Sequence, residues 1–197
     1  MLRRIRQILT SSFGFEIMET NLKKIERTSE LKTEENWEFR SFLKGYDIPL
    51  DEIDSIVHEL FDYVSSEIDC TKCANCCKEV SPLLKENDIK KLSENIGISI
   101  PEFKKQFLKK TDEGDCTFSR LPCPFLKNNV CTQYKYRPGD CRSYPHLHKE
   151  DFVFRLIGVI DNYSICPIVF NVYELLKERI GEGSIPNDFD EFFDFED

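Results

Sequence analysis

The residues of this chain that could do chemistry are its cysteines. Nine occur in 197 residues, and four of them stand in the segment Cys70–Cys77, which reads CTKCANCC. Two cysteines separated by two residues can turn both sulfurs toward one ion, because the backbone between them can wrap around the metal. That spacing occurs twice in succession here, and iron–sulfur clusters and structural zinc sites both use such repeats. The segment therefore predicts thiolate ligation of a metal.

A vicinal pair, Cys76 and Cys77, ends this segment. Neighbouring cysteines project in different directions in most backbone conformations, so they seldom serve one tetrahedral ion together. The pair indicates two centres or a polynuclear one. It also favours an iron–sulfur cluster, of the 4Fe–4S kind, over zinc, since a cluster offers its ligands a wider cage.

A second group of four cysteines follows along the chain. Prolines on both sides of Cys123 restrict its backbone, and a proline–glycine turn over residues 137–140 leads to Cys141. Cys166 stands directly before a proline at a predicted helix start, where the helix dipole favours a thiolate. The predicted metal ligands are Cys70, Cys73, Cys76, Cys77, Cys123, Cys131, Cys141 and Cys166. They divide into two groups of four, and one four-cysteine site with spare thiols is the alternative.

Two other uses of cysteine explain this pattern less well than ligation does. Burial as a small hydrophobe does not explain the doubled spacing with a vicinal pair. Disulfide bonding does not suit an odd cysteine count, at about 5% of the chain, in a reducing compartment. Cys116 lies in an acidic segment and fits neither group, so we predict that it is a bystander thiol.

Several polar residues near the cysteines have two interpretations. His146 and His148 could supplement the thiolates if their segment were extended, but a polar loop is the preferred interpretation. His58 is predicted to be a surface residue on a helix. The basic residues close to the cysteines either offset thiolate charge or are ordinary surface residues; they are Lys72, Lys78, Arg137 and Arg142.

Hydrophobic periodicity predicts the elements that must position these residues. The predicted helices are 50–68, one from Ile89 to Gly97, one begun by Ser99, and one after Pro167 that ends before Gly181. Residues 151–160, rich in Phe, Val and Ile, predict a strand, with a turn at Asp161-Asn162. The expected fold class is mainly α with a short β-strand pair (α+β), as a small irregular metal-centred domain.

Composition divides the chain into three predicted regions. Residues 1–36 mix seven bases with six acids and predict a loosely attached N-terminal helical arm. Residues 37–181 hold every cysteine and form the predicted metal-binding domain. Residues 182–197 contain seven acids, no base and four phenylalanines, which is typical of a disordered tail or of a docking peptide for an unknown protein partner.

Several classes of function do not fit this composition. The net charge of −9 argues against non-specific nucleic-acid binding, and no apolar run is long enough to span a membrane. The basic N-terminus lacks the apolar region of a signal peptide, so we expect a cytoplasmic protein. No phosphate loop, dinucleotide fingerprint, nucleophile elbow or radical-enzyme cysteine spacing is present.

The cysteine pattern resembles the YkgJ-like cysteine-cluster family, which is described as a zinc- or iron-chelating domain. The resemblance covers about residues 65–170 and includes the cysteines of the first segment. Its downstream motifs are Pro122-Cys123-Pro124-Phe125-Leu126, Cys131 with Tyr134, and Arg137-Pro138 leading to Cys141-Arg142-Ser143-Tyr144-Pro145. Flagellin lysine N-methylases look like longer relatives with the same signature. The resemblance implies metal binding and no settled reaction.

We therefore expect a redox, sensing or accessory module that binds an iron–sulfur cluster or zinc. One alternative is a protein-modifying enzyme of the lysine N-methylase kind, suggested only by the longer relatives. Another is a metal storage or delivery protein. An enzyme would need an open metal position or a cosubstrate pocket, whereas a structural metal site is closed.

Overall fold

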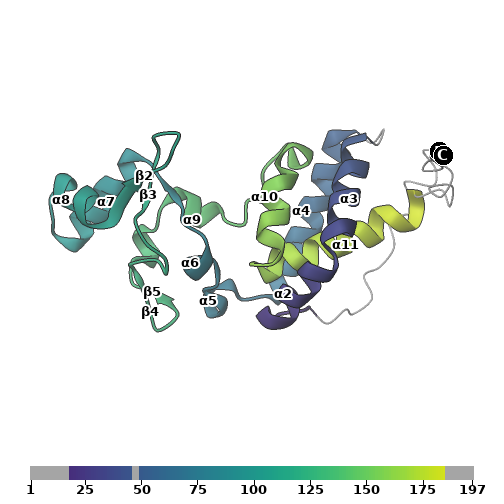
Figure 1. Ribbon diagram of the computed structural model, residues 1–197, viewed down its shortest axis with the longest axis horizontal. Coiled ribbons are helices and arrows are strands. Elements are labelled where there is room, and N and C mark those ends of the chain that lie inside the picture. Colours follow the sequence, from purple (N-terminus) through teal and green to yellow (C-terminus); the bar gives the residue numbers. More distant parts are fainter. Residues whose placement is uncertain (1–17, 46–48, 185–197) are drawn as a thin grey trace, which may run out of the picture.

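The computed structural model describes residues 18–45 and 49–184. Two groups of elements, each with its own hydrophobic core, lie along the long axis of the molecule, and short helices join them (Figure 1). We call these two parts the bundle and the small lobe. In the described part of the chain, no helix is long and apolar enough to cross a membrane.

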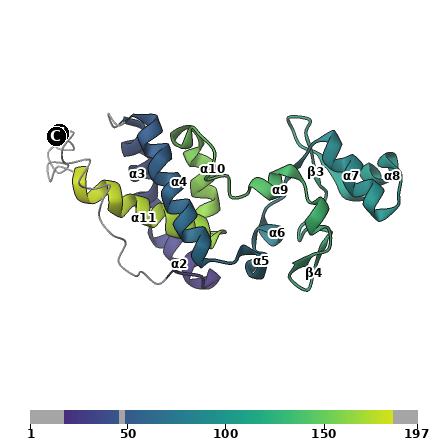
Figure 2. The ribbon, with the colours of Figure 1, turned by 180° about the vertical axis from the view of Figure 1, so that it is seen from behind.

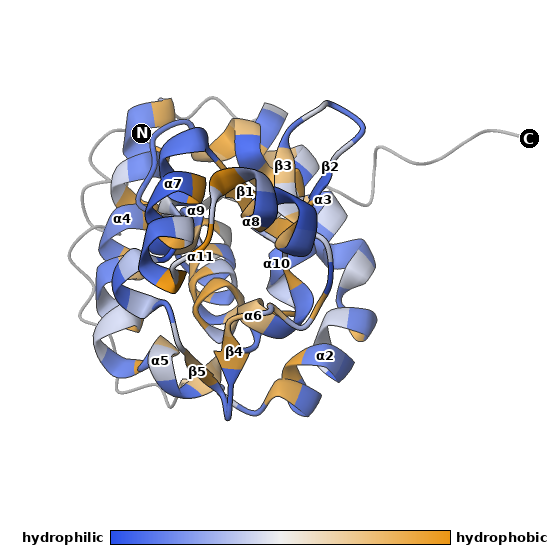
Figure 3. Cartoon of the chain, turned by 90° about the vertical axis from the view of Figure 1, so that its left-hand side faces the viewer, coloured by the Kyte–Doolittle hydropathy of each residue, from blue (hydrophilic) through white to orange (hydrophobic). Residues whose placement is uncertain are grey.

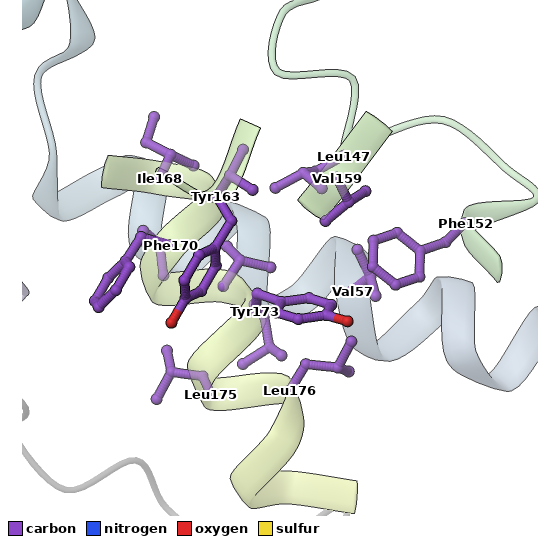
Figure 4. Packing of buried hydrophobic residues seen from close by; sticks show 14 of the residues in the cluster. Val57, Leu147, Phe152, Val159, Tyr163, Ile168, Phe170, Tyr173, Leu175 and Leu176 are labelled. Carbon is purple, nitrogen blue, oxygen red and sulfur yellow. The ribbon is translucent and has the colours of Figure 1, made fainter. Parts of the chain in front are cut away.

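The bundle is built from helices at both ends of the chain. They are α2 (Leu22–Leu31), α3 (Thr33–Gly45), α4 (Leu50–Glu67), α10 (Leu156–Tyr163), α11 (Pro167–Ser184) and the 3-10 helix η2 (Phe152–Arg155). Val57 and Leu60 of α4 are fully buried, as is Tyr173 of α11, and this apolar packing holds the bundle together (Figure 4). The predicted helices over 50–68 and after Pro167 are thus confirmed, although α11 continues through Gly181.

The predicted loose attachment of the N-terminal arm is wrong for residues 18–36. Ile25 of α2 is fully buried in the bundle core. Asn171 of α11 accepts the Glu19 N–H at 2.9 Å, and Lys32 forms an ion pair with Glu174. The few apolar residues of this segment recur at helical spacing and therefore share one face. Because that face packs onto α11, the segment is held firmly although most of its residues are polar. Residues 1–17 lie outside the described residues.

The predicted strand at 151–160 is also wrong, because these residues form η2 and the start of α10. The predicted turn at 161–162 lies inside α10. Asp54 of α4 is buried, and its carboxylate accepts the N–H groups of Asp151 at 2.7 Å and Phe152 at 2.9 Å. This long-range cap satisfies the free N–H groups at a helical start and outweighs the β propensity of the segment.

The small lobe contains two helices and a small sheet. Its elements are β1 (Leu83–Leu84), α7 (Glu86–Ile96), α8 (Ile100–Phe107), β2 (Leu108–Lys110), β3 (Cys116–Phe118) and the hairpin β4 (Leu126–Lys127) with β5 (Val130–Cys131). The first three strands pair antiparallel in the order β1-β3-β2. Figure 3 shows largely hydrophobic β1 and β3 beside the mostly hydrophilic α7 and α8.

The local signals of the small lobe are confirmed. Gly97 ends α7 with a φ of 75°, which favours glycine, and the Ser99 hydroxyl accepts the Glu102 N–H at 3.3 Å to start α8. Ile89, Leu92 and other apolar residues fill the core. The fold class, mainly α with short β structure, is therefore confirmed.

The junction between the bundle and the small lobe carries most of the cysteines. Its elements are α5 (Cys70–Cys73), α6 (Cys76–Glu79), the 3-10 helix η1 (Tyr134–Tyr136) and α9 (Gly139–Ser143). Figure 2 shows α5, α6 and α9 between the two parts from the opposite side.

The predicted domain boundaries at residues 36 and 181 stay predictions. Of the predicted tail, residues 182–184 belong to α11 and the remainder lies outside the described residues.

Candidate metal centre

The first cysteine segment folds as two single helical turns. The Asp69 carboxylate caps α5 by accepting the Thr71 N–H at 3.0 Å. Ala74 then adopts a left-handed φ of 53°, which ends α5 and lets α6 start at Cys76. The Asn75 side-chain amide donates to the Ile165 carbonyl at 2.9 Å, which fixes this segment against the bundle. The repeated spacing therefore produces a sharp bend rather than one continuous helix.

Cys76 and Cys77 at the end of the bend differ in the cysteines that influence them most. Their thiols are hydrogen-bonded to each other. Apart from this pair, Cys76 interacts most strongly with Cys166 of the bundle. Cys77 instead interacts electrostatically with Cys123, Cys131 and Cys141. The vicinal pair thus stands between two neighbourhoods of thiols.

The first neighbourhood, which we call the lobe-side group, consists of Cys77, Cys123, Cys131 and Cys141. The Cys123 N–H donates to the Cys77 carbonyl at 2.7 Å, and the β4–β5 hairpin brings Cys131 opposite Leu126. Helix α9 supplies Cys141. Every pair among the four cysteines interacts electrostatically. Three separate segments of the chain therefore bring four thiols to one place.

Burial and like charge govern the acidity of these thiols. Burial, followed by the charges of its cysteine neighbours, raises the pKa of Cys141 to about 12. Burial likewise raises the pKa of Cys123 to about 11, and it raises that of Cys131. The hydrogen bond from Cys76 has the opposite effect on Cys77 and lowers its pKa to about 7. Mutual repulsion of this kind is relieved when a cation binds between thiolates.

The second neighbourhood, the bundle-side group, consists of Cys70, Cys73, Cys76 and Cys166. Cys166 is buried at the start of α11 and interacts electrostatically with both Cys73 and Cys76. Cys70 is exposed and interacts with Cys73, so it is the outermost member. Burial raises the pKa of Cys166 to about 11.

A bound metal must match this donor set. All nine cysteines are free thiols, and thiolate is a preferred ligand of zinc and of iron–sulfur clusters. Among the residues that the structure describes, no group of three or more Cys, His, Asp or Glu side chains is arranged to hold an ion. The donors therefore fit these metals by the type of their atoms, and the described cysteine side chains are not arranged around an ion in this structure.

Cys116 has a different environment from the predicted ligands. It lies in β3, opposite Leu84 and Lys110, and is buried in the small-lobe core. Its side chain packs with apolar residues there. This environment suits the predicted bystander thiol, which stays a prediction.

The histidines near the cysteines are held by other partners. The Nδ1 atom of His146 hydrogen bonds to the Ser143 hydroxyl at 2.7 Å, and its Nε2 atom is 3.3 Å from the Asp140 carboxylate. The His148 ring instead lies 6.0 Å from that of Phe61, centroid to centroid. The predicted surface position of His58 is wrong in part, since its Nε2 atom is buried without a hydrogen-bond partner.

Two of the four basic residues near the cysteines act on thiols. Arg137 lies 3.8 Å above the Tyr134 ring, and its positive charge offsets part of the rise in pKa that burial causes at Cys70 and Cys131. Lys78 lowers the pKa of its neighbour Cys77. Positive charge at these positions favours the thiolate that a metal needs.

The other two basic residues have structural contacts. Lys72 lies 3.4 Å from the Asp69 carboxylate. The Nε atom of Arg142 donates to the Arg137 carbonyl at 3.0 Å, which braces the turn before Cys141.

Sequence reasoning missed the Tyr144 side chain as a member of the site. Its hydroxyl donates to the Asn162 side-chain oxygen at 2.6 Å, and burial followed by the neighbouring thiols of Cys166 and Cys76 raises its pKa. The available signal was its position three residues after Cys141, close to a predicted ligand. Its proximity to Cys166 depends on the tertiary structure.

Comparisons with known proteins give one match. Residues 69–156 match the model of the CxxCxxCC family, described as "Putative zinc- or iron-chelating domain". No curated protein and no solved structure matches the chain. The matched segment holds seven of the eight predicted ligands, and Cys166 lies beyond it. Residues 69–156 are therefore similar to this cysteine-cluster family, whose description supports the binding of zinc or iron.

Proposed function

We propose that this chain is a metal-binding module with two four-thiolate centres, one in the lobe-side group and one in the bundle-side group. The observation that carries the proposal is the grouping of the lobe-side cysteines, in which Cys123 donates its N–H to the Cys77 carbonyl at 2.7 Å and every pair interacts electrostatically. Four thiolates in this partly buried place would repel one another, so most of these cysteines stay protonated without a metal. A bound cation offsets that repulsion and allows the thiolates to form.

The vicinal pair supports two centres rather than one. Cys77 has three cysteine neighbours from the small-lobe side, whereas Cys76 is influenced more by Cys166 than by Cys141. A single centre would leave four of these thiols, several with a raised pKa, without a partner. Two centres use all eight.

Iron–sulfur clusters are favoured over zinc by the same spacing. Two consecutive short spacings followed by a vicinal pair suit the wider cage of a cluster. A cluster would supply one-electron transfer, and zinc would supply a structural crosslink. In either case the chain itself holds the group through thiolates, and Arg137 and Lys78 offset part of their charge.

The placement of the cysteines supports a redox, sensing or accessory role. The proposed ligands come from α5, α6, α9, the hairpin, the loop with Cys123 before it and the residue before α11, and these segments meet where the bundle and the small lobe join (Figure 1). Loss or oxidation of the metal would therefore alter the contact between two separately packed cores. This coupling is what a sensing module requires.

The enzyme alternative gains no specific support. One hollow on the small lobe is lined by Lys91, Glu94, Asn95 and Tyr136. None of these residues is a cysteine, so this hollow does not combine a cosubstrate pocket with a proposed metal ligand.

The test is metal and acid-labile sulfide analysis of protein made and purified without oxygen. We expect brown protein with iron and sulfide. Colourless protein with tightly held zinc would show that the metal is zinc rather than an iron–sulfur cluster, and the proposal of two thiolate centres would stand. Protein without any metal would contradict the proposed function.

Single variants distinguish two centres from one. Cys76→Ser and Cys77→Ser should each lose about half of the metal, because each removes one ligand from a different centre. Cys116→Ala is the matched control and should keep the full metal content. Complete loss of metal in both variants would show one shared centre.

A further inference from the structure

The charges of this chain are unevenly distributed along its sequence. Residues 83–136, from β1 to η1, contain ten Lys or Arg and seven Asp or Glu, a net charge of +3, although the whole chain carries −9. The residues that follow α11 have the opposite composition, because residues 185–197 contain six acids, no base and four phenylalanines. This last segment is therefore complementary in charge to the small lobe.

A hollow of about 320 Å³ on the small lobe has an aromatic wall and a charged rim. Its lining residues come from α7 and η1, and they are Lys91, Glu94, Asn95 and Tyr136. Tyr136 is half-buried and packs against the small-lobe core. Ligand pockets start at about 300 Å³, so the hollow is large enough for one aromatic side chain but small for a cofactor.

The lysines around this hollow have few partners within the protein. In the described part of the chain, Lys91 is exposed and forms no hydrogen bond or ion pair. Lys135 lies over the Tyr136 ring, with its Nζ atom 5.6 Å from the ring centroid. The acid in the lining, Glu94, has the ammonium group of Lys90 at 3.9 Å. Positive charge therefore exceeds negative charge at the rim, which favours an acidic ligand.

Asn95 adds a hydrogen-bonding group to the same hollow. Its side-chain nitrogen donates to the Gln133 side-chain oxygen, and this bond fixes the orientation of the amide. The Asn95 side-chain oxygen can then accept the N–H of a bound peptide backbone. An aromatic wall, exposed lysines and this acceptor together match a peptide in which phenylalanines alternate with acids.

We propose that this hollow binds the acidic, phenylalanine-rich segment 185–197 of a second copy of the chain. One phenylalanine ring packs against Tyr136, and neighbouring carboxylates pair with Lys91 and Lys135. The inference goes beyond the proposed metal binding, and it does not depend on which metal the cysteines hold.

The position of the hollow favours a second copy over the same chain. Figure 1 shows the end of α11 and the small lobe at opposite ends of the long axis. Helix α11 has 18 residues, and at about 1.5 Å per residue it leads about 27 Å away from the junction. The segment 185–197 reaches about 45 Å when fully extended, so most of its length would be needed to return along the bundle. A neighbouring copy removes this constraint and gives a head-to-tail contact.

The test measures the association of the full-length protein by sedimentation velocity over a wide range of concentration. We expect reversible association that weakens as the salt concentration rises. The double variant Lys91→Glu with Lys135→Glu should associate about tenfold more weakly, because it reverses the charge at the rim. The matched control is Lys105→Glu with Lys109→Glu, two exposed lysines of the small lobe outside the hollow lining, and it should associate as the wild type does.

Two changes in the segment test the other side of the contact. Replacement of its four phenylalanines by alanine should also weaken association about tenfold. A chain with Asp190→Lys, Glu191→Lys and Asp194→Lys should not associate with itself, since both surfaces are then basic. Mixed with the Lys91→Glu, Lys135→Glu chain, it should associate again. This rescue also shows that both variants are folded.

Three results would overturn the inference. The first is full-length protein that stays monomeric at every concentration, including one whose hollow binds a synthetic 185–197 peptide only after alanine replaces its own phenylalanines. The second is association that the hollow variants leave intact or that the control variants weaken equally. The third is a charge-exchanged mixture that does not associate. Metal content is measured separately, so protein without metal would overturn the proposed function alone.

Discussion

The backbone N–H of Cys123 donates a hydrogen bond of 2.7 Å to the carbonyl oxygen of Cys77. This contact joins the first cysteine segment to the proline-flanked cysteine of the small lobe. It involves only backbone atoms, so it holds two proposed ligands together whichever side chains they carry. The lobe-side group is therefore organised in part before any metal binds.

Cys123→Ala should remove the lobe-side metal and destabilise the protein. Metal binding free energy contributes directly to folding in sites of this type, so we expect a loss of about 4 kcal/mol or more in the free energy of unfolding. Thermal or denaturant unfolding of the loaded protein, with metal analysis, measures both effects. Cys116→Ala should cost only about 1 kcal/mol, for one small buried side chain, and keep the metal. Equal metal loss in the two variants would contradict the assignment of Cys116.

Substitutions of Cys77 and of Cys123 should not have additive effects on metal content. If both bind the same metal, the double variant Cys77→Ser with Cys123→Ala should lose no more metal than either single variant. Cys73→Ala combined with Cys123→Ala should instead lose the metal of both centres. Additive loss in the first pair would place Cys77 and Cys123 in different centres.

In the metal-free protein, Cys77 should be the first cysteine to react with iodoacetamide near neutral pH. The reactive species is the thiolate, and the hydrogen bond from Cys76 lowers the Cys77 pKa to about 7. Cys123 and Cys141, with pKa values raised to about 11 and about 12, should react slowly. Peptide mapping after a short exposure measures the order. Cys76→Ala should slow Cys77, because it removes the hydrogen-bond donor.

Metal affinity of the lobe-side group should rise steeply with pH. The raised pKa values of Cys123, Cys131 and Cys141 keep these thiols protonated at neutral pH, so binding must release three protons. Below the Cys77 pKa of about 7 a fourth proton is released. The logarithm of the binding constant should thus change by about three per pH unit above neutrality and about four below it. Competition with a pH-characterised chelator measures the slope, and Cys73→Ala removes the other centre while it keeps Cys76 beside Cys77. A slope near one would contradict binding by four thiols.

Asp54→Ala should destabilise the bundle by about 2 kcal/mol, because it removes the acceptor for two N–H groups at the start of η2. Asp62→Ala is the matched control, since Asp62 is an exposed acid on the same helix. Denaturant unfolding of both variants gives the comparison. Equal stability of the two proteins would show that the cap does not stabilise the helical form of residues 151–160.

Local signals in the sequence were enough to predict several of the helices. The apolar stripe of α4, the Gly97 stop and the Ser99 cap act between residues three or four positions apart, so the sequence contains all of their causes. The cysteine spacing is also a local signal, and the metal binding that it predicted is supported by the family match, while ligation by the individual cysteines stays a prediction.

Contacts between distant parts of the chain decided the features that local signals could not predict. Residues 151–160 became helical because Asp54, about 97 positions away, supplies the cap. The division of the cysteines into two groups, with Tyr144 beside one of them, depends on α9 and α11 meeting the bend at Ala74. No local pattern contains these contacts. They arise because two separate hydrophobic cores must be buried, and burying them brings distant segments of the chain together at the junction.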